Sequence, residues 1–288
     1  MQLITGTTKL LGIIGDPVEH SFSPIMHNQA IASLGADYIY VPLPVKSANL
    51  KTALAGFSAI GLQGFSVTIP HKQAIIPLLS EVSNIGQLVG AVNTIYPTAQ
   101  GWGGTNTDVA GFIAPLQAYQ RDWSKTVVVV LGYGGAARAV VVGCSQLGCT
   151  DIHIVGRNPS KLSQFQQSWD KTSLPITLNI HPWQKLPELV PQAELLINTT
   201  PLGMSPQVDQ SPVSGEILSK LQHGAIAYDL VYTPNPTKFL QEAKQQGAIT
   251  IDGLEMLVEQ GAAALKIWLR KKPPVEVMRQ SLHQYLGL

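Results

Sequence analysis

Short apolar runs alternate with segments of helical period along the first hundred residues. The apolar runs end at glycine or proline, as buried strands do, and the segments between them repeat apolar residues three and four positions apart. Ser23 and Pro24 suit the cap and the first position of a helix. We therefore expect strands over 11–15, 38–42 and 64–69, and helices over 23–34, 50–60 and 71–79.

The pattern changes near residue 125, where a run of β-branched residues is typical of a strand buried on both faces. Glycines and a small-residue helix from about residue 136 follow that run. The alternation of strands and helices predicts the α/β class, with two α/β domains that each contain a mostly parallel sheet. The further predicted strands are 126–131, 151–155, 194–198 and 225–230, and the predicted C-terminal helices are 253–269 and 275–285.

A chain of 288 residues is expected to form two domains. We assign 1–108, together with the C-terminal helices of about 253–288, to a substrate domain. We assign 109–252 to a Rossmann-type nucleotide-binding domain. The chain would then cross between the domains twice, which predicts a cleft between them.

Composition argues against several classes of partner. Charged residues make up only 13 % of the chain and its net charge is +1, so we expect neither nucleic acid nor a membrane surface as a partner. Weak charge permits a homodimer. The long apolar stretch 127–147 contains four glycines and Arg138, which favours a strand, a turn and a helix over a membrane span. Cys144 and Cys149 predict free thiols, no metal site and a cytoplasmic location.

A glycine turn follows the buried strand, with the pattern G-x-G-x-x-A over 132–137. Gly132 permits a sharp turn, Gly134 permits the close approach of a pyrophosphate, and Ala137 permits close packing of helix on strand. The N-terminus of the helix offers free N–H groups to the phosphates. The alternative is a turn with a purely structural purpose, since glycines alone are weak evidence.

The end of the next strand bears on the choice of cofactor. An NAD site usually has an acidic residue there, whereas this chain has Gly156, Arg157 and Asn158, with Lys161 one turn further on. A guanidinium can bind a 2′-phosphate with two hydrogen bonds, so Arg157 predicts NADP rather than NAD. The alternative is that Arg157 is a solvated surface residue.

Polar residues that could carry chemistry follow the predicted strands. Thr68 and Lys72 follow the third strand, at the carboxyl end where open α/β sheets bind ligands. A lysine partly removed from water can act as acid or base, and Asp108 is the carboxylate that we pair with Lys72. A surface lysine and a helix-capping aspartate are the alternatives. Ser21 and Ser23 could hold a small carboxylate, although Ser23 could be only a helix cap.

Four further candidates lie later in the chain. Asn198 and Thr199 follow a strand of the nucleotide-binding domain and could line the cofactor site, or they could form an Asx turn. Tyr232 and Gln260 are of types that occur commonly at the edge of a core, so residue type alone does not single them out.

Taken together, these segments resemble the shikimate dehydrogenase family, whose members are oxidoreductases that use NADP to interconvert 3-dehydroshikimate and shikimate in chorismate and aromatic amino-acid biosynthesis. The resemblance runs from Gly15 to about Gln260, and the order and number of the motifs make it specific. The matching segments are GDP at 15–17, HSFSP at 20–24 with His27 and Asn28, VTIPHK at 67–72, GAVNT at 90–94, NTD at 106–108, GYGGAAR at 132–138, NTTPLGM at 198–204 and DGLEMLVEQ at 252–260.

The resemblance implies roles at the matching positions. Lys72 would transfer the proton to or from the C3 oxygen while the nicotinamide transfers hydride at C3, and Asp108 would position Lys72. The implied substrate contacts are Ser21, Ser23, Thr68, Asn93, Tyr232 and Gln260. The implied cofactor contacts are Gly132, Tyr133, Gly134, Gly135, Ala136, Gly156, Arg157, Asn158, Lys161, Asn198, Thr199, Leu230, Gly253 and Met256.

Three positions depart from the family pattern. Ser66 stands where asparagine is usual, Tyr133 stands where alanine is common within the glycine turn, and Gly156 stands where asparagine is typical. The last two concern the cofactor, and none concerns the predicted proton-transfer pair. Two alternative functions stay open: a quinate/shikimate dehydrogenase that uses NAD or NADP, and a non-catalytic NADP-binding sensor on the same scaffold.

Overall fold

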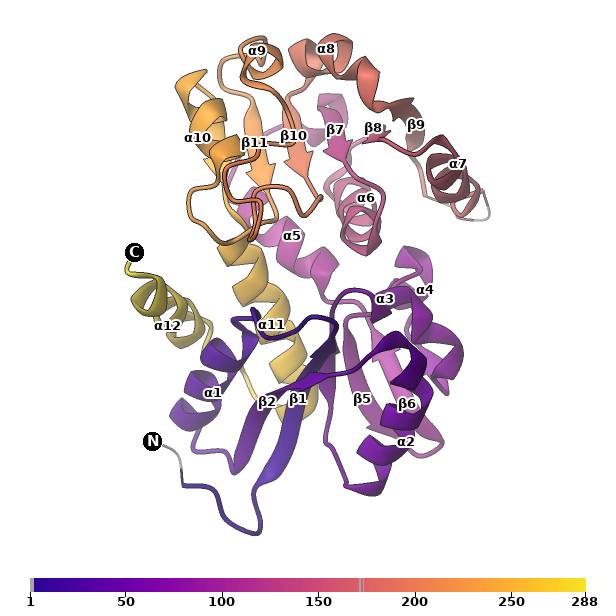
Figure 1. The fold of residues 1–288 in the computed structure, drawn as a ribbon, viewed down its shortest axis with the longest axis vertical. Coiled ribbons are helices and arrows are strands. Elements are labelled where there is room, and N and C mark those ends of the chain that lie inside the picture. The colour runs from indigo at the N-terminus through magenta and orange to yellow at the C-terminus, as the bar shows by residue number, and fades with distance from the viewer. Residues whose placement is uncertain (1–2, 171, 173) are drawn as a thin grey trace. The chain divides into compact units, whose positions relative to one another are not determined.

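The computed structural model describes residues 3–170, 172 and 174–288, and contacts between Cα atoms divide the chain into two compact units (Figure 1). Unit 1 comprises Met1–Gly111 and Leu257–Leu288, and unit 2 comprises Phe112–Met256. Each unit contains a six-stranded sheet, which confirms the predicted α/β class with two domains. No helix among the residues described is long and apolar enough to span a bilayer.

Unit 1 contains a mixed sheet with the strand order β2-β1-β3-β5-β6-β4. β1 pairs in parallel with β2 and β3, and β4 pairs in parallel with β6, whereas β5 is antiparallel to both of its neighbours. Leu11, Ile13 and Ile14 of β1 are buried, as expected for a strand that pairs on both sides, with β2 and β3. The strands are β1 (Lys9–Gly15), β2 (Tyr38–Pro44), β3 (Phe65–Val67), β4 (Glu81–Val82), β5 (Thr94–Thr98) and β6 (Gly101–Thr105).

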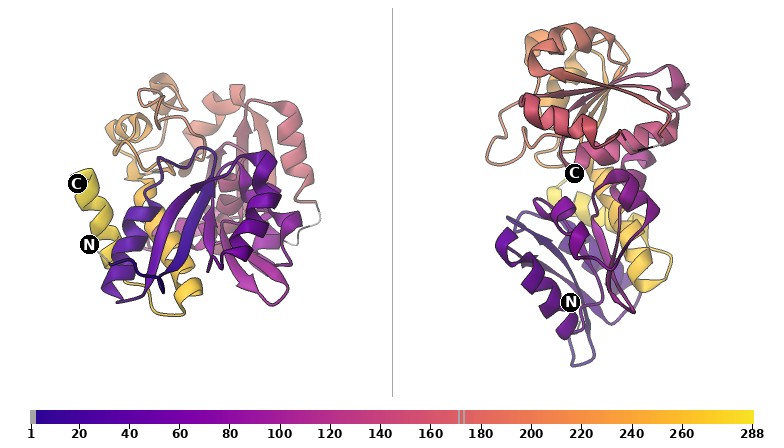
Figure 2. Two further views of the ribbon diagram at one scale, coloured as in Figure 1. Left: turned by 60° about the horizontal axis from the view of Figure 1, so that its bottom comes forward. Right: turned by 90° about the vertical axis from the view of Figure 1, so that its right-hand side faces the viewer.

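Helices cover this sheet, and the chain's last helix, α12, packs beside α1 (Figures 1 and 2). α5 (Asp108–Leu116) and α11 (Gly253–Leu269) each contain a boundary between the units. The other helices of unit 1 are α1 (Ser23–Ser33), α2 (Leu50–Ala59), α3 (His71–Ala74), α4 (Asn84–Val89) and α12 (Val275–Leu286).

Two local predictions for unit 1 were wrong, and one hairpin was missed. The single helix expected over 71–79 is α3 followed by a 3₁₀ turn at Ile76–Leu78, since Pro77 has no N–H to continue an α-helix. Phe22, rather than Ser23, occupies the cap position of α1, and Ser23 is the first helical residue. The hairpin of β5 and β6 was not predicted, because GWGGT lacks the usual apolar alternation. There, Gly103 lies against the ring of Tyr96, which a larger side chain would overlap.

Unit 2 contains a fully parallel sheet with the strand order β12-β11-β10-β7-β8-β9. β7 (Val127–Leu131) is central. The chain continues from β7 to β8 and β9 on one side, and then returns to β10, β11 and β12 on the other. Open α/β sheets bind ligands at such a switch point, outside the carboxyl ends of the strands. The other strands are β8 (Asp151–Gly156), β9 (Thr177–Pro182), β10 (Leu195–Asn198), β11 (Ile226–Asp229) and β12 (Ile249–Ile251).

The helices of unit 2 connect these parallel strands. α6 follows β7, and α7 follows β8, as parallel crossover connections require. One apolar core joins β10 and β11 to α10 through residues such as Leu196, Ala227 and Phe239. The helices are α6 (Gly135–Leu147), α7 (Pro159–Gln167), α8 (Leu186–Leu189), α9 (Gly215–Leu218) and α10 (Lys238–Gln245).

Candidate active site

A lysine–aspartate pair lies at the carboxyl end of β3 in unit 1. The chain leaves β3, turns at Pro70 and enters α3, which carries Lys72. Asp108 is the first residue of α5, directly after β6. Lys72 Nζ donates to Asp108 Oδ2 at 2.6 Å, and the side chains retain only 18 % and 6 % of their exposed area. The ion pair is therefore largely shielded from water, where a charge without its partner would be costly.

The N-terminal cap of α5 is Asn106, not Asp108, which the sequence offered as an alternative cap. Val109 N donates to Asn106 Oδ1 at 3.2 Å, and Asn106 Nδ2 donates to the carbonyl oxygen of Ala91 at 3.0 Å. Asn106 therefore caps the helix and fixes the loop before it. The carboxylate of Asp108 is left to pair with Lys72, so the alternative of Asp108 as a helix cap is wrong.

Asn93 connects this pair to a distant part of the chain. Its Nδ2 donates to Asp108 Oδ1 at 2.8 Å, to Thr107 Oγ1 at 2.9 Å and to Gln260 Oε1 at 3.3 Å. Its Oδ1 accepts from Thr107 N at 2.8 Å. The structure thus brings Lys72, Asp108, Asn93 and Gln260 into one network. Thr107 was not predicted, and only its place in the NTD segment could have indicated it.

The other predicted substrate residues of unit 1 lie near the ends of β1 and β3. These strands are parallel with Ile14 opposite Val67, so the residues that follow them emerge at the same edge of the sheet. Thr68 is half-buried there, and its methyl group fills the space that a side chain at Gly15 would need. Ser21 Oγ accepts from Ser23 N at 3.3 Å.

The buried phenol of Tyr40 lies next to the hydroxyls of Ser23 and Ser66. Burial raises the pKa of Tyr40 well above its usual value, and the hydroxyls of Ser66 and Ser23 act in the opposite direction. Ser66, one of the three departures from the family pattern, therefore interacts through its hydroxyl with the buried phenol of Tyr40. We have no further account of that substitution.

The turn between β7 and α6 fits a dinucleotide. Gly132 has φ +111°, a conformation that favours glycine, and a Cβ there would lie 2.6 Å from Thr199 Oγ1. A Cβ on Gly134 would meet none of the described atoms within 4 Å, so this face of the turn is open. Gly134 caps a helix of 13 residues, whose first N–H groups need acceptors. The turn therefore has the space and the donors that a pyrophosphate requires.

The end of β8 presents a cation and no carboxylate. Arg157 is exposed, and its guanidinium carbon lies 5.6 Å from the centre of the Trp183 ring. Asn158 caps α7 by accepting from Lys161 N at 3.0 Å. Lys161 is also exposed. Two cations therefore stand in the first turn of α7 and the residues before it, where they suit an anionic group.

The end of β10 adopts the Asx turn that the sequence left open. Asn198 Oδ1 accepts from Thr200 N at 2.9 Å, and its Nδ2 donates to Leu202 O and to Asp229 Oδ1. The side chain of Asn198 is fully buried and its amide is engaged on both sides. Thr199 Oγ1 donates to the carbonyl oxygen of Leu131 at 2.7 Å, which ties this turn to the end of β7.

Asp229, at the end of β11, was not predicted. It is fully buried and accepts from Asn198 Nδ2, from Val231 N and, at 2.7 Å, from Thr237 Oγ1. Burial raises its pKa to about 6, while those three hydrogen bonds oppose the rise. A charged residue at the end of an otherwise apolar strand was the only signal in the sequence.

The remaining predicted cofactor residues lie where β11 ends and α11 begins. A side chain at Gly253 would overlap the carbonyl group of Leu230, so these two segments are in direct contact. Met256 is buried, and Leu230 and Tyr232 are half-buried. Within the described residues, no three His, Cys, Asp or Glu side chains are placed to hold a metal ion.

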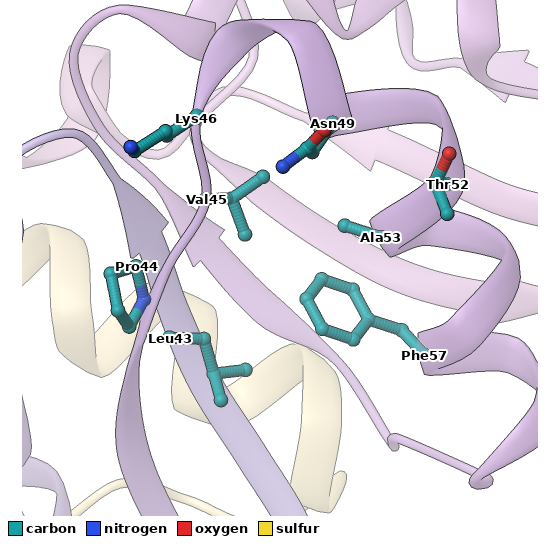
Figure 3. A pocket seen from close by; sticks show the side chains of 8 residues that line it. All are labelled: Leu43, Pro44, Val45, Lys46, Asn49, Thr52, Ala53 and Phe57. Carbon is teal, nitrogen blue, oxygen red and sulfur yellow. The ribbon is translucent and has the colours of Figure 1, made fainter.

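A separate hollow of about 700 Å³ lies in unit 1 between the end of β2 and α2 (Figure 3). Its walls contain none of the predicted site residues. The lining residues are Leu43, Pro44, Val45, Lys46, Asn49, Thr52, Ala53 and Phe57.

Two family models match the chain. The shikimate dehydrogenase substrate binding domain matches residues 13–95, and the shikimate 5′-dehydrogenase C-terminal domain matches residues 253–283. A curated relative, the shikimate dehydrogenase (NADP(+)) of Trichormus variabilis (strain ATCC 29413 / PCC 7937), is 62 % identical over 288 residues, which cover 99 % of this chain and 100 % of that protein.

Solved structures are also similar over nearly the whole chain. A shikimate dehydrogenase in complex with NADP+ is 37 % identical with a TM-score of 0.88, and the match covers 99 % of this chain and 98 % of that one. The shikimate 5-dehydrogenase of Listeria monocytogenes, in complex with shikimate and NAD, is 31 % identical with a TM-score of 0.86, covering 98 % and 99 %.

Proposed function

Because this chain belongs to the shikimate dehydrogenase family, we propose that it catalyses the reversible, NADP-dependent reduction of 3-dehydroshikimate to shikimate. The observation that carries this proposal is the shielded ion pair of Lys72 and Asp108. A non-catalytic sensor would need to bind the nucleotide but would need no proton-transfer pair, so this pair supports an enzyme over a sensor.

Lys72 handles the proton in this reaction. NADPH, when bound, supplies the hydride that reaches C3 of the substrate. The Lys72 ammonium group gives a proton to the C3 oxygen in the reduction, and the neutral amine takes it back in the oxidation. Asp108 holds Nζ through Oδ2, while its Oδ1 accepts from Asn93, so both oxygens of the carboxylate are fixed. This geometry supports the role of Asp108 in positioning Lys72.

The substrate is a small polyhydroxylated ring acid, and the residues around the pair suit it. Asn93 and Gln260 have amides close to Asp108, where they bind ring hydroxyls together with Thr68. Ser21 and Ser23 bind the carboxylate, next to the start of α1. For Tyr232, a role in substrate binding is what the resemblance to the family implies.

The cofactor is bound by unit 2. Residues 132–136 and the start of α6 hold the pyrophosphate, and Arg157, Asn158 and Lys161 hold the 2′-phosphate. Leu230, Gly253 and Met256 would lie against the nicotinamide when the cofactor is bound. Asn198 acts through the turn that it forms, and Thr199 lies next to Gly132.

Replacing Lys72 tests the proposal. Lys72→Ala should lower kcat by roughly 10²- to 10⁴-fold, because a general acid–base group is lost, and should leave the Kd of NADP+ unchanged. Lys72→Arg is the matched control: it keeps a cation beside Asp108, but a guanidinium does not release its proton, so kcat should stay low. Near-normal turnover in either variant would contradict the role of Lys72.

A specificity matrix tests the substrate and the cofactor. Shikimate with NADP should give the highest kcat/KM among shikimate and quinate combined with NADP and NAD. Comparable activity with quinate would favour a quinate/shikimate dehydrogenase, and inactivity with all four combinations would favour the sensor. A cytoplasmic location and a homodimer remain predictions from the sequence.

A further inference from the structure

The ring of Tyr133 packs on Gly156. Tyr133 lies in the turn between β7 and α6, and Gly156 is the last residue of β8. A Cβ on Gly156 would lie 2.5 Å from both Cδ1 and Cε1 of the Tyr133 ring, and 2.9 Å from Cδ2 of Leu162. Gly156 is buried, and its φ lies outside the positive range that favours glycine. Steric contact with the ring, rather than backbone conformation, therefore accounts for a glycine at this position.

The two positions that depart from the family pattern thus lie in direct contact. The resemblance described above implies a small residue at 133 and a larger one at 156, and this chain has the reverse. Exchanges that conserve volume are the ones that packed interiors tolerate. Here the phenol ring occupies the space in which a side chain at 156 would lie.

This contact joins the two parts of the nucleotide site. In folds of this type the turn after the first strand holds the pyrophosphate, and the end of the second strand holds the adenosine ribose. Tyr133 belongs to the first part and packs on the second, and its ring is only half-buried. The exposed part of the ring therefore borders the ribose position.

The same contact bears on Arg157. Gly156 precedes Arg157 directly, and glycine restrains the backbone less than any other residue. The ring of Tyr133 packs on one side of this segment, and the ring of Trp183 lies beside the guanidinium. The Asn158 cap fixes the following turn. Aromatic rings thus lie on the segment before Arg157 and beside its guanidinium.

We propose that Tyr133 is a specificity-determining residue for the 2′-phosphorylated adenosine of the cofactor, and that it acts as a pair with Gly156. Its ring forms the floor of the ribose subsite and holds the segment that carries Arg157. This proposal rests on the NADP site of the proposed function.

Four proteins test the pair: the wild type, Tyr133→Ala, Gly156→Asn and the double variant. The measurements are the melting temperature of the free protein and the Kd values of NADP+, NAD+ and adenosine 2′,5′-bisphosphate by calorimetry, none of which requires turnover. Gly156→Asn alone should lower the melting temperature, because the new side chain overlaps the ring. The double variant should recover most of that loss, since the ring is gone.

Tyr133→Ala should weaken binding of NADP+ and of adenosine 2′,5′-bisphosphate about tenfold, as expected for the loss of one aromatic contact, and should weaken NAD+ less. Tyr119→Ala, a half-buried tyrosine of the same unit, is the matched control and should leave all three Kd values unchanged.

Two results would overturn the proposal. One is a Tyr133→Ala protein that binds all three ligands as the wild type does. The other is a Gly156→Asn protein as stable as the wild type while Tyr133 is present. Failure of the NADP site on which this proposal rests would look different, because the wild type itself would then bind no NADP+.

Discussion

Replacing Asp229 with asparagine should change how stability depends on pH. The free energy of unfolding of Asp229→Asn, compared with that of the wild type, should rise from pH 5 to pH 8, although Asp229 accepts three hydrogen bonds. The carboxyl group is fully buried, and its pKa is raised from 3.8 to about 6. Between these values the folded protein keeps a proton that the unfolded chain has lost. The contribution of Asp229 to the free energy of unfolding is therefore largest below pH 3.8, falls as the pH rises from 3.8 to about 6, and is lost above that.

The size of this effect follows from the two pKa values. The rise of roughly two units corresponds to about 3 kcal/mol in total, of which about 1.4 kcal/mol is lost between pH 5 and pH 8. The amide of an asparagine stays neutral over this range and removes that dependence. In the variant, the hydroxyl of Thr237 loses the carboxylate to which it donates a hydrogen bond. At neutral pH, where the wild-type carboxylate is charged, losing this hydrogen bond costs about 1 kcal/mol.

Urea unfolding at pH 5, 6, 7 and 8 measures the difference between Asp229→Asn and the wild type. This difference should move in favour of the variant by roughly 1 kcal/mol or more over the range. Other titrating groups contribute equally to both proteins and cancel. Asp209→Asn, at an exposed position, is the control for losing one negative charge and should differ from the wild type by a constant amount. Parallel curves for Asp229→Asn and the wild type would refute the reasoning.

Three further substitutions test the site. Asp108→Asn should lower kcat by roughly 10²-fold or more, because Lys72 loses its carboxylate partner, with binding of NADP+ retained as the check that the protein is folded. Arg157→Ala should raise the KM for NADP by roughly tenfold or more and change that for NAD little; equal effects on the two would remove its assignment to the 2′-phosphate. Gly134→Ala should leave the melting temperature within about one degree of the wild type, since the methyl group meets no described atom within 4 Å. It should weaken NADP+ binding at least about tenfold, because the methyl group blocks the approach of the pyrophosphate. Unchanged binding would contradict the placement of the turn.

Much of the fold could be predicted because its signals are local. The buried run of β7 and the glycines after it lie within a dozen residues, and α11 begins and ends where the sequence predicted. The elements that prediction missed, such as the hairpin of β5 and β6, form through contacts across strands. In β6, Gly103 leaves the space that the ring of Tyr96 occupies, and a larger side chain would overlap that ring.

The candidate site divides in the same way. Lys72 and Arg157 could be singled out because each lies soon after the end of a strand, and the resemblance to a family added residues such as Asn93 that no local pattern marks. The sequence could not decide whether Asp108 caps a helix or pairs with Lys72. The structure decides this question, because Asn106 supplies the cap.

The sequence by itself thus determined the alternation of strands and helices in the α/β class, the glycine turn and the cation where β8 ends, because each depends on neighbours along the chain. Only the tertiary structure decided which side chains meet. It joined Asn93 to Gln260, 167 residues away, buried the carboxyl group of Asp229, and placed the ring of Tyr133 on Gly156. Such contacts arise when distant segments pack together and exclude water, and a pattern read along the chain does not contain them.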